Sequence, residues 1–232
     1  MTIQETSNRR TFAQCLMQDF CFKKMADVLK KWEMADVRTV PDVMYQVRCG
    51  SDENDPTIEY QINWFIDCAE THIHNHQNSF YTYCLEGQYE EKIWRIVDGH
   101  DDSITYKFSR NPDNTLTPGR PICGSLRHVA SRYHFPGNQM HVDTEHVHSI
   151  SAIAGSNERV LTFLIKKKHS VPVNTFVLSS DPEFHLQNSE MRSATEDERD
   201  MMFDKLVEVL TISHNPQWTK LIDLELNNAA DI

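Results

Sequence analysis

The spacing of apolar residues changes along the chain, and it begins as the spacing of a helix. From residue 12 onward apolar side chains return every three or four positions, which places them on one face of an α-helix. Thr11 and Gln14 form a capping-box pattern at its start, and Pro41 ends the region. We therefore predict a helical segment over residues 11–35. Its apolar positions are Phe12, Leu16, Phe20, Met25, Val28 and Leu29.

Residues 43–178 differ in composition and spacing. Short runs rich in Val, Ile, Tyr, Phe and Thr are separated by turn signals such as Glu86-Gly87 and Pro136-Gly137. Many short strands at close spacing indicate a sandwich or a barrel. The predicted strands cover residues 43–48, 58–66, 72–76, 80–85, 89–97, 103–108, 132–135, 139–142, 146–150, 160–166 and 174–178.

The last part of the chain returns to helical spacing. Ser193 and Glu196 form a second capping-box pattern, and an apolar stripe runs from Met201 to Leu210. A further short helix is expected around residues 218–224. We therefore predict a C-terminal helical segment over residues 193–225, and we expect both helical segments to pack on the outside of the β core.

Length and charge limit the number of domains and the kinds of partner that we expect for this protein. A chain of 232 residues can form one large domain or two small ones, and we take residues 1–232 as one domain, because β-barrels of this length are often single. The net charge of −11 argues against nucleic acid or an anionic membrane as a partner, because phosphate binding needs a basic surface. No apolar run approaches the ~18 residues of a membrane span.

The expected compartment is the cytosol. The first ten residues are polar and lack the apolar core of a signal peptide. The six cysteines are scattered without a Cys-x-x-Cys pair, and in a chain without an export signal we expect them to be reduced.

The histidines carry the strongest chemical signal. Five of the twelve stand at alternate positions in two runs, at 72, 74 and 76 and again at 146 and 148. Residues two apart on a strand face the same way, so each run can direct imidazoles toward one point inside a barrel. Imidazole is the commonest protein ligand for iron, copper, nickel and zinc. We predict that His74, His76 and His148 bind a metal ion; the alternative is three buried histidines bonded to the backbone.

His72 and His146 lie on the same sides of their predicted strands as these ligands. Each could serve as a fourth ligand, as a residue that orients a ligand, or as a general base. The alternative is a histidine in solvent at the rim of the barrel. Both are therefore candidate catalytic residues.

The histidine runs also match the motifs of a known superfamily. His74-x-His76, Phe80 and Gly87 form one motif, and Pro136-Gly137 followed by His148 forms the second. This pattern resembles the cupins, whose small double-stranded β-helix barrel carries His-x-His, usually a glutamate, and a last histidine. Phe80 stands at the position of that glutamate. The resemblance implies a mainly β cupin barrel with three histidine ligands, no carboxylate ligand, and Phe80 as a wall of the site.

Among cupins, the thiol dioxygenases, with cysteine dioxygenase as the best-known member, also use three histidines. Residues 73–79, Ile-His-Asn-His-Gln-Asn-Ser, are similar to their Ile-His-Asp-His-x-x-Ser, and residues 85–91 are similar to their Leu-x-Gly-x-Leu-x-Glu stretch. That family carries an arginine in the neighbourhood of Arg48, which grips the substrate carboxylate. The resemblance covers about residues 43–165 and implies Arg48 as a substrate anchor; the alternative is an exposed arginine on an edge strand.

Two features depart from that family. Thiol dioxygenases carry a Ser-His-Tyr set on the strand after the second motif, whereas residues 161–165 supply neither His nor Tyr. The substrate is therefore not expected to be simply cysteine. The stretch between the motifs, residues 88–138, is long, and we take it as a candidate lid or pocket segment. It carries Arg110, Arg120, Arg127 and Arg132.

The expected function is a mononuclear non-haem Fe(II) oxygenase. Three neutral imidazoles hold Fe(II) on one face and leave the other open for substrate and O₂. A neutral ligand set keeps the full 2+ charge, which favours an anionic substrate such as an amino acid or a thiol carboxylate. One alternative is a metal-dependent cupin isomerase or lyase without O₂ chemistry, with His72 or His146 as its base. Another is a non-catalytic cupin that binds a metal or ligand. Cupins often pair through their outer sheets, so the resemblance also allows a homodimer.

Overall fold

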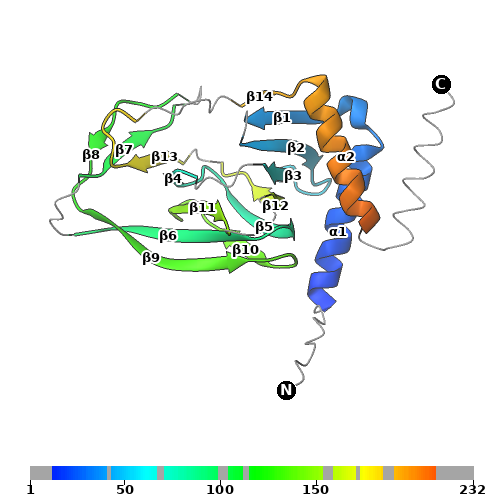
Figure 1. The fold of residues 1–232 in the computed structure, drawn as a ribbon, viewed down its shortest axis with the longest axis horizontal. Helices are drawn as coiled ribbons and strands as arrows, with labels where there is room; N and C mark the ends of the chain where they lie inside the picture. Colours follow the sequence, from blue (N-terminus) through cyan, green and yellow to red (C-terminus); the bar gives the residue numbers. More distant parts are fainter. Residues whose placement is uncertain are drawn as a thin grey trace, which may run out of the picture.

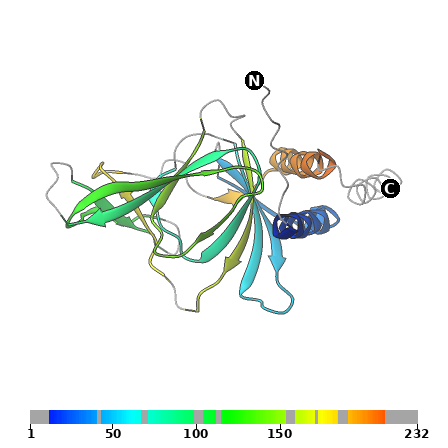
Figure 2. The ribbon, with the colours of Figure 1, turned by 90° about the horizontal axis from the view of Figure 1, so that it is seen from below.

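The computed structural model describes residues 12–40, 43–66, 71–98, 104–111, 115–153, 159–170, 173–184 and 191–212. Within this part of the chain, two antiparallel sheets of seven strands are accompanied by two helices (Figures 1 and 2). The first sheet has the order β10 (Gln139–Val142), β5 (Ser79–Glu86), β12 (Val160–Lys167), β3 (Ile58–Phe65), β2 (Met44–Ser51), β1 (Asp36–Val40) and β14 (Arg192–Ser193). The second has the order β8 (Arg120–Pro121), β7 (Tyr106–Ser109), β13 (Phe176–Ser179), β4 (Ile73–His74), β11 (His148–Ala152), β6 (Tyr89–Val97) and β9 (Ser125–His134).

Eight of these strands form four antiparallel pairs that are nested in the sequence, as in one long hairpin folded over into two sheets. β3 pairs with β12, β4 with β11, β5 with β10 and β6 with β9, and these nested antiparallel pairs alternate between the two sheets. Each sheet then holds two of the pairs side by side, in the orders β10-β5-β12-β3 and β4-β11-β6-β9. This is the jelly-roll arrangement found in cupins. The predicted double-stranded β-helix barrel is therefore confirmed.

The two helices lie on the outer face of the first sheet (Figure 2). Met25 of α1 (Phe12–Leu29) and Leu206 of α2 (Glu196–Ile212) belong to one buried core with Ile62 of β3 and Phe163 of β12. Because side chains alternate along a strand, the neighbouring residues on β3 and β12 face the interior of the barrel instead. The predicted packing of the helices outside the β core is confirmed. Neither helix of the described chain carries an apolar stretch long enough to cross a lipid bilayer.

The predicted N-terminal helical segment is not one continuous α-helix. The α-helix ends at Leu29, and a 3₁₀ turn, η1 (Trp32–Met34), follows it. The guanidinium of Arg199 on α2 donates hydrogen bonds to the carbonyl oxygens of Trp32, at 2.6 Å, and Ala35, at 2.8 Å. These contacts hold the turn from which the chain enters β1, a strand that the sequence pattern did not predict. Thr11, one half of the predicted capping box, lies outside the described residues, as does the helix expected at 218–224.

The C-terminal capping box lies two residues later than predicted. The backbone N–H of Glu198 donates to the Thr195 hydroxyl, at 3.4 Å, and the backbone N–H of Thr195 donates to the Glu198 carboxylate, at 2.8 Å. Ser193 cannot fill this role, because it lies in β14 and pairs with Arg38 of β1. The predicted Ser193–Glu196 box is therefore wrong, although the spacing and chemistry of a capping box hold.

Gly87, in the tight connection from β5 to β6, and Gly50 both have positive φ, and Gly87 is predicted to be the more sensitive of these two to substitution. Its φ is +81°, and a Cβ added there would lie 2.2 Å from the carbonyl oxygen of Arg159. Gly50 has a φ of +85° but no atom within 4 Å of an added Cβ. We expect Gly50→Ala to cost about 1–2 kcal/mol from the backbone alone, and Gly87→Ala to cost roughly 3–5 kcal/mol because the backbone of residue 159 must also move. Urea unfolding followed by circular dichroism measures both, and equal losses would contradict the close approach.

Candidate metal centre

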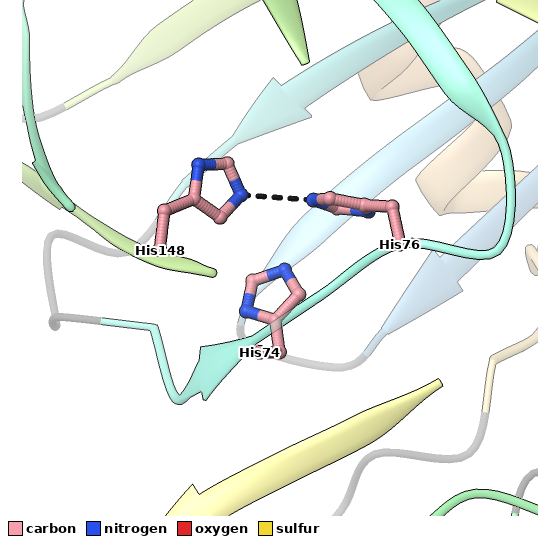
Figure 3. A group of neighbouring side chains, drawn as sticks. All are labelled: His74, His76 and His148. Atoms are coloured by element: carbon pink, nitrogen blue, oxygen red, sulfur yellow. Dashed lines mark hydrogen bonds between the residues drawn. The ribbon is translucent and has the colours of Figure 1, made fainter. Parts of the chain in front are cut away.

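Three histidines meet at one end of the barrel interior. His74 ends β4, His148 begins β11, and the two residues pair directly across the second sheet. His76 follows two residues after β4. The ring centroids lie 4.7–5.1 Å apart, and one ligating nitrogen of each residue lies within 4.8 Å of the others (Figure 3). The structure thus brings together the three predicted ligands.

A buried asparagine explains how His76 reaches this position. The predicted strand over 72–76 is shortened to Ile73–His74, so alternation along a strand does not place His76. The Asn75 side chain instead donates to the carbonyl oxygens of Thr144, at 3.0 Å, and Asn174, at 3.2 Å, and accepts from the backbone N–H of Phe176, at 2.8 Å. Together with the backbone bond from the Asn75 N–H to the carbonyl oxygen of Phe176, at 3.4 Å, these bonds anchor the residue that lies between His74 and His76.

Hydrogen bonds fix which nitrogen of two rings is available. Nδ1 of His74 lies 2.6 Å from the carbonyl oxygen of His72, and Nδ1 of His148 lies 2.7 Å from a carboxylate oxygen of Glu91. A carbonyl and a carboxylate oxygen can only accept, so each Nδ1 carries the proton. Nε2 of His74 and of His148 is then left with a lone pair, as a metal ligand requires.

The three rings are held in the neutral form. Burial, reinforced by the neighbouring His148, lowers the pKa of His74 to about 3. Burial and the neighbouring histidines hold the pKa of His76 well below its ordinary value. Burial also lowers the pKa of His148, although the carboxylate of Glu91 opposes this shift. Neutral imidazole is the form that binds a metal, so no proton has to be displaced at neutral pH.

Behind His148 lies a fully buried carboxylate, Glu91 of β6. Its Oε1 accepts from Nδ1 of His148, at 2.7 Å, and Nε2 of His146, at 2.8 Å, while its Oε2 lies 3.4 Å from Nε2 of His134. Burial alone would raise the pKa of Glu91, but the hydrogen bonds from these three imidazoles outweigh it and hold the pKa far below the ordinary range. Glu91, His146 and His148 could themselves gather around a cation. We assign Glu91 to orienting His148, because it occupies the protonated nitrogen of that ring.

The donor set of the triad fits a divalent transition metal. Nε2 of His76 lies 2.8 Å from Nε2 of His148 (Figure 3). Two imidazole nitrogens bound at ~2.1 Å in perpendicular directions stand about 3 Å apart, close to this separation. Three neutral imidazoles without a carboxylate or thiolate suit iron, copper, nickel or zinc rather than calcium or magnesium.

The triad faces a chamber inside the barrel of about 460 Å³, which we call the inner chamber. Phe80 lies edge-on to the ring of His76, with centroids 4.8 Å apart, and Met140 and Leu164 line the same apolar side. The next strand of the same sheet, β3, is polar on this face, with Gln61 beside Leu164 and Asn63 also facing inward. None of the described residues that line the inner chamber is acidic.

A second cavity, the outer cavity, has a volume of about 650 Å³ and shares part of its lining with the inner chamber. The residues common to both include His74, Gln61, Arg110 and Lys166. Residues that line the outer cavity but not the inner chamber include Arg38, Arg48 and Lys168. Glu59 lines the outer cavity as well, so its described wall carries one carboxylate beside these basic side chains.

The other predicted site residues fall in three places. Phe80 lines the inner chamber beside the triad. Arg48 lies in the outer cavity, half exposed, with its guanidinium 3.4 Å from the Asp36 carboxylate. His72 also lines the outer cavity and packs edge-on against Phe184. His146 is bonded to Glu91 and is not among the residues that line the inner chamber. The roles of Arg48, His72 and His146 remain predictions.

Comparisons with known proteins give remote structural likenesses. No family model and no curated protein sequence matches the chain. A hydroxypropylphosphonic acid epoxidase from S. wedmorenis is 12% identical, with a TM-score of 0.36; the match covers 58% of this chain and little more than half, 56%, of the epoxidase. An RmlC-like cupin from Shewanella frigidimarina is 13% identical, with a TM-score of 0.34, and covers 60% of this chain and 88% of its own.

A cupin-like protein from Thermotoga maritima is also 13% identical, with a TM-score of 0.33, and the match covers 72% of this chain and 87% of that protein. Similarities this remote carry no statement about activity. The assignment of the barrel rests on the strand order described above, and the resemblance to thiol dioxygenases remains a prediction.

Proposed function

We propose that the protein is a mononuclear non-haem iron oxygenase, in which His74, His76 and His148 bind Fe(II) and O₂ oxidises a small anionic substrate. The observation that supports this most directly is the meeting of three neutral imidazoles at the wall of a chamber with room for a ligand. A closed structural site would leave no such space. An iron ion bound there supplies open coordination positions and the redox chemistry that protein side chains lack.

The surrounding residues have separate tasks in this proposal. Glu91 keeps a proton on Nδ1 of His148, and the carbonyl of His72 does the same for His74, so that the two Nε2 atoms stay directed at one point. Phe80 and Leu164 exclude water from one side of the inner chamber. The absence of acidic residues from its described lining favours an anionic ligand, since a neutral ligand set does not offset the charge of the ion.

Metal analysis and oxygen uptake test the proposal. Protein purified without added metal, and then loaded anaerobically with Fe(II), should bind one iron per chain and consume O₂ with one member of a panel of amino acids, dicarboxylates and thiols. The thiols are cysteine, cysteamine and 3-mercaptopropionate. Turnover that persists without O₂, or with zinc in place of iron, would instead identify a metal-dependent isomerase or lyase. Failure to bind iron would end the proposal.

A further inference from the structure

Two cations line the inner chamber, whose described lining contains no acidic residue. Arg110 follows β7 in the second sheet, Lys166 lies on β12 in the first sheet, and both line the inner chamber. Within the described part of the chain, no carboxylate lies at ion-pair distance from either side chain. Their neighbours in the outer cavity differ, because Arg48 pairs with Asp36, at 3.4 Å, and Lys168 pairs with Glu59, at 2.6 Å.

Arg110 is fixed in place by its backbone. Its N–H donates to the carbonyl oxygen of Thr175, at 2.8 Å, and it forms a β-bridge with Leu116. Burial lowers the pKa of Arg110, and its charge contributes to the lowered pKa of both His72 and His74. A partly buried guanidinium without a counter-charge is costly, and an anionic ligand would relieve that cost.

Lys166 is held by a row of buried amides. Its ammonium donates to the side-chain oxygen of Gln61, at 2.5 Å, and the amide nitrogens of Gln61 and Gln46 both donate to the side-chain oxygen of Asn63. Burial lowers the pKa of Lys166 to about 8, against an opposing effect of Glu59, so the group is mainly charged at pH 7. An ammonium has three donors, so two remain for a ligand.

We infer that the inner chamber binds a small dicarboxylate, with one carboxylate held by Arg110 and the other by Lys166. The guanidinium offers a planar pair of donors that matches a carboxylate, and the ammonium offers a point charge. Because the two cations come from opposite sheets, a ligand that touches both spans the chamber beside the histidine triad. A volume of about 460 Å³ suits a ligand of this size. The idea that this ligand is the substrate rests on the proposed function, whereas the prediction that the ligand binds does not.

Calorimetry on the metal-free, full-length protein tests the inference without iron or O₂. The probes are malonate, succinate, glutarate and adipate, each compared with the monocarboxylate of the same chain length. At least one dicarboxylate should bind tenfold or more tightly than its monocarboxylate partner, since the monocarboxylate loses the charge-assisted hydrogen bonds of one anchor. If no dicarboxylate is preferred, the inference is wrong. Binding without oxygen uptake would contradict the proposed function and leave the dicarboxylate site intact.

Substitutions locate the anchors. Arg110→Met and Lys166→Met should each weaken binding of the preferred dicarboxylate by about 10- to 100-fold and remove the preference over the monocarboxylate. Arg127→Met is the matched control, because Arg127 is exposed on β9 and lines neither cavity, and its affinity should stay unchanged. A preference that survives both substitutions, or is lost only in Arg48→Met, would overturn the assignment. Arg110→Lys keeps the charge should the methionine variant fail to fold, and it should retain only part of the affinity.

Discussion

Replacing His76 with alanine is expected to leave the barrel folded and to remove tight iron binding. Loss of a residue that merely supports a ligand costs roughly 10- to 100-fold in metal affinity, and loss of one of three ligands should cost more than this. His76 is the most informative of the three, because its ring contacts are with Phe80, His74 and His148, and none of its described contacts is with Glu91. The network around Glu91 should therefore survive the substitution.

His141→Ala provides the control for this experiment. His141 lies on β10 of the same barrel, is exposed, and packs against Tyr81 with ring centroids 4.6 Å apart and the rings tilted by 37°. Anaerobic titration with Fe(II), followed by calorimetry, measures the affinity, and Co(II) absorption reports the ligand environment independently of activity. A His76→Ala variant that binds iron as tightly as the unchanged protein would exclude His76 as a ligand, whatever its effect on turnover.

The barrel could be predicted because its strands are short runs of β-forming residues between turn signals; β3 and β12 are buried along most of their length, whereas β10 alternates. The bounds of β6 and β10 match the predicted 89–97 and 139–142. The strands that were missed are stabilised by tertiary pairing rather than by their own pattern. β14 has two residues, Arg192 and Ser193, both exposed, and it exists because it pairs with β1. β9 begins at Ser125 rather than 132, since pairing with β6 extends it along a run of mostly exposed residues.

The site was predictable only in part, and for a partly different reason than the pattern suggested. Alternation correctly relates His74 to its strand, but His76 reaches the triad through the hydrogen bonds of Asn75 after the strand has ended. One feature of the sequence could have identified Glu91: it is an acidic residue two positions after Tyr89, on the inward side of a correctly predicted strand. Arg110 was one of four arginines in the candidate lid or pocket segment, but nothing in the sequence states that this segment folds back against β13 and brings only Arg110 of the four to the chamber.

Glu91→Gln is expected to have a large effect on stability together with a clear effect on metal affinity. The carboxylate is fully buried and accepts from three imidazoles, at 2.7, 2.8 and 3.4 Å. A glutamine has one acceptor oxygen and presents an N–H₂ group where the second oxygen stood, so at least one buried ring N–H would face another donor. Removing one partner of a buried charged network costs roughly 3–5 kcal/mol, and we expect a loss of that size in the free energy of unfolding of the metal-free protein at pH 7.

The same substitution should weaken iron binding by roughly 10- to 100-fold, because the proton on Nδ1 of His148 is no longer held by an anion and Nε2 is no longer directed at the triad. Glu90→Gln is the matched control: Glu90 is adjacent on β6 but points to the other face of the sheet, and both quantities should change little. Urea unfolding and anaerobic Fe(II) titration measure the two effects separately. Lost stability with unchanged iron affinity would make Glu91 a packing residue only, whereas loss of both supports a carboxylate that folds the barrel and aligns its metal ligand through one set of hydrogen bonds.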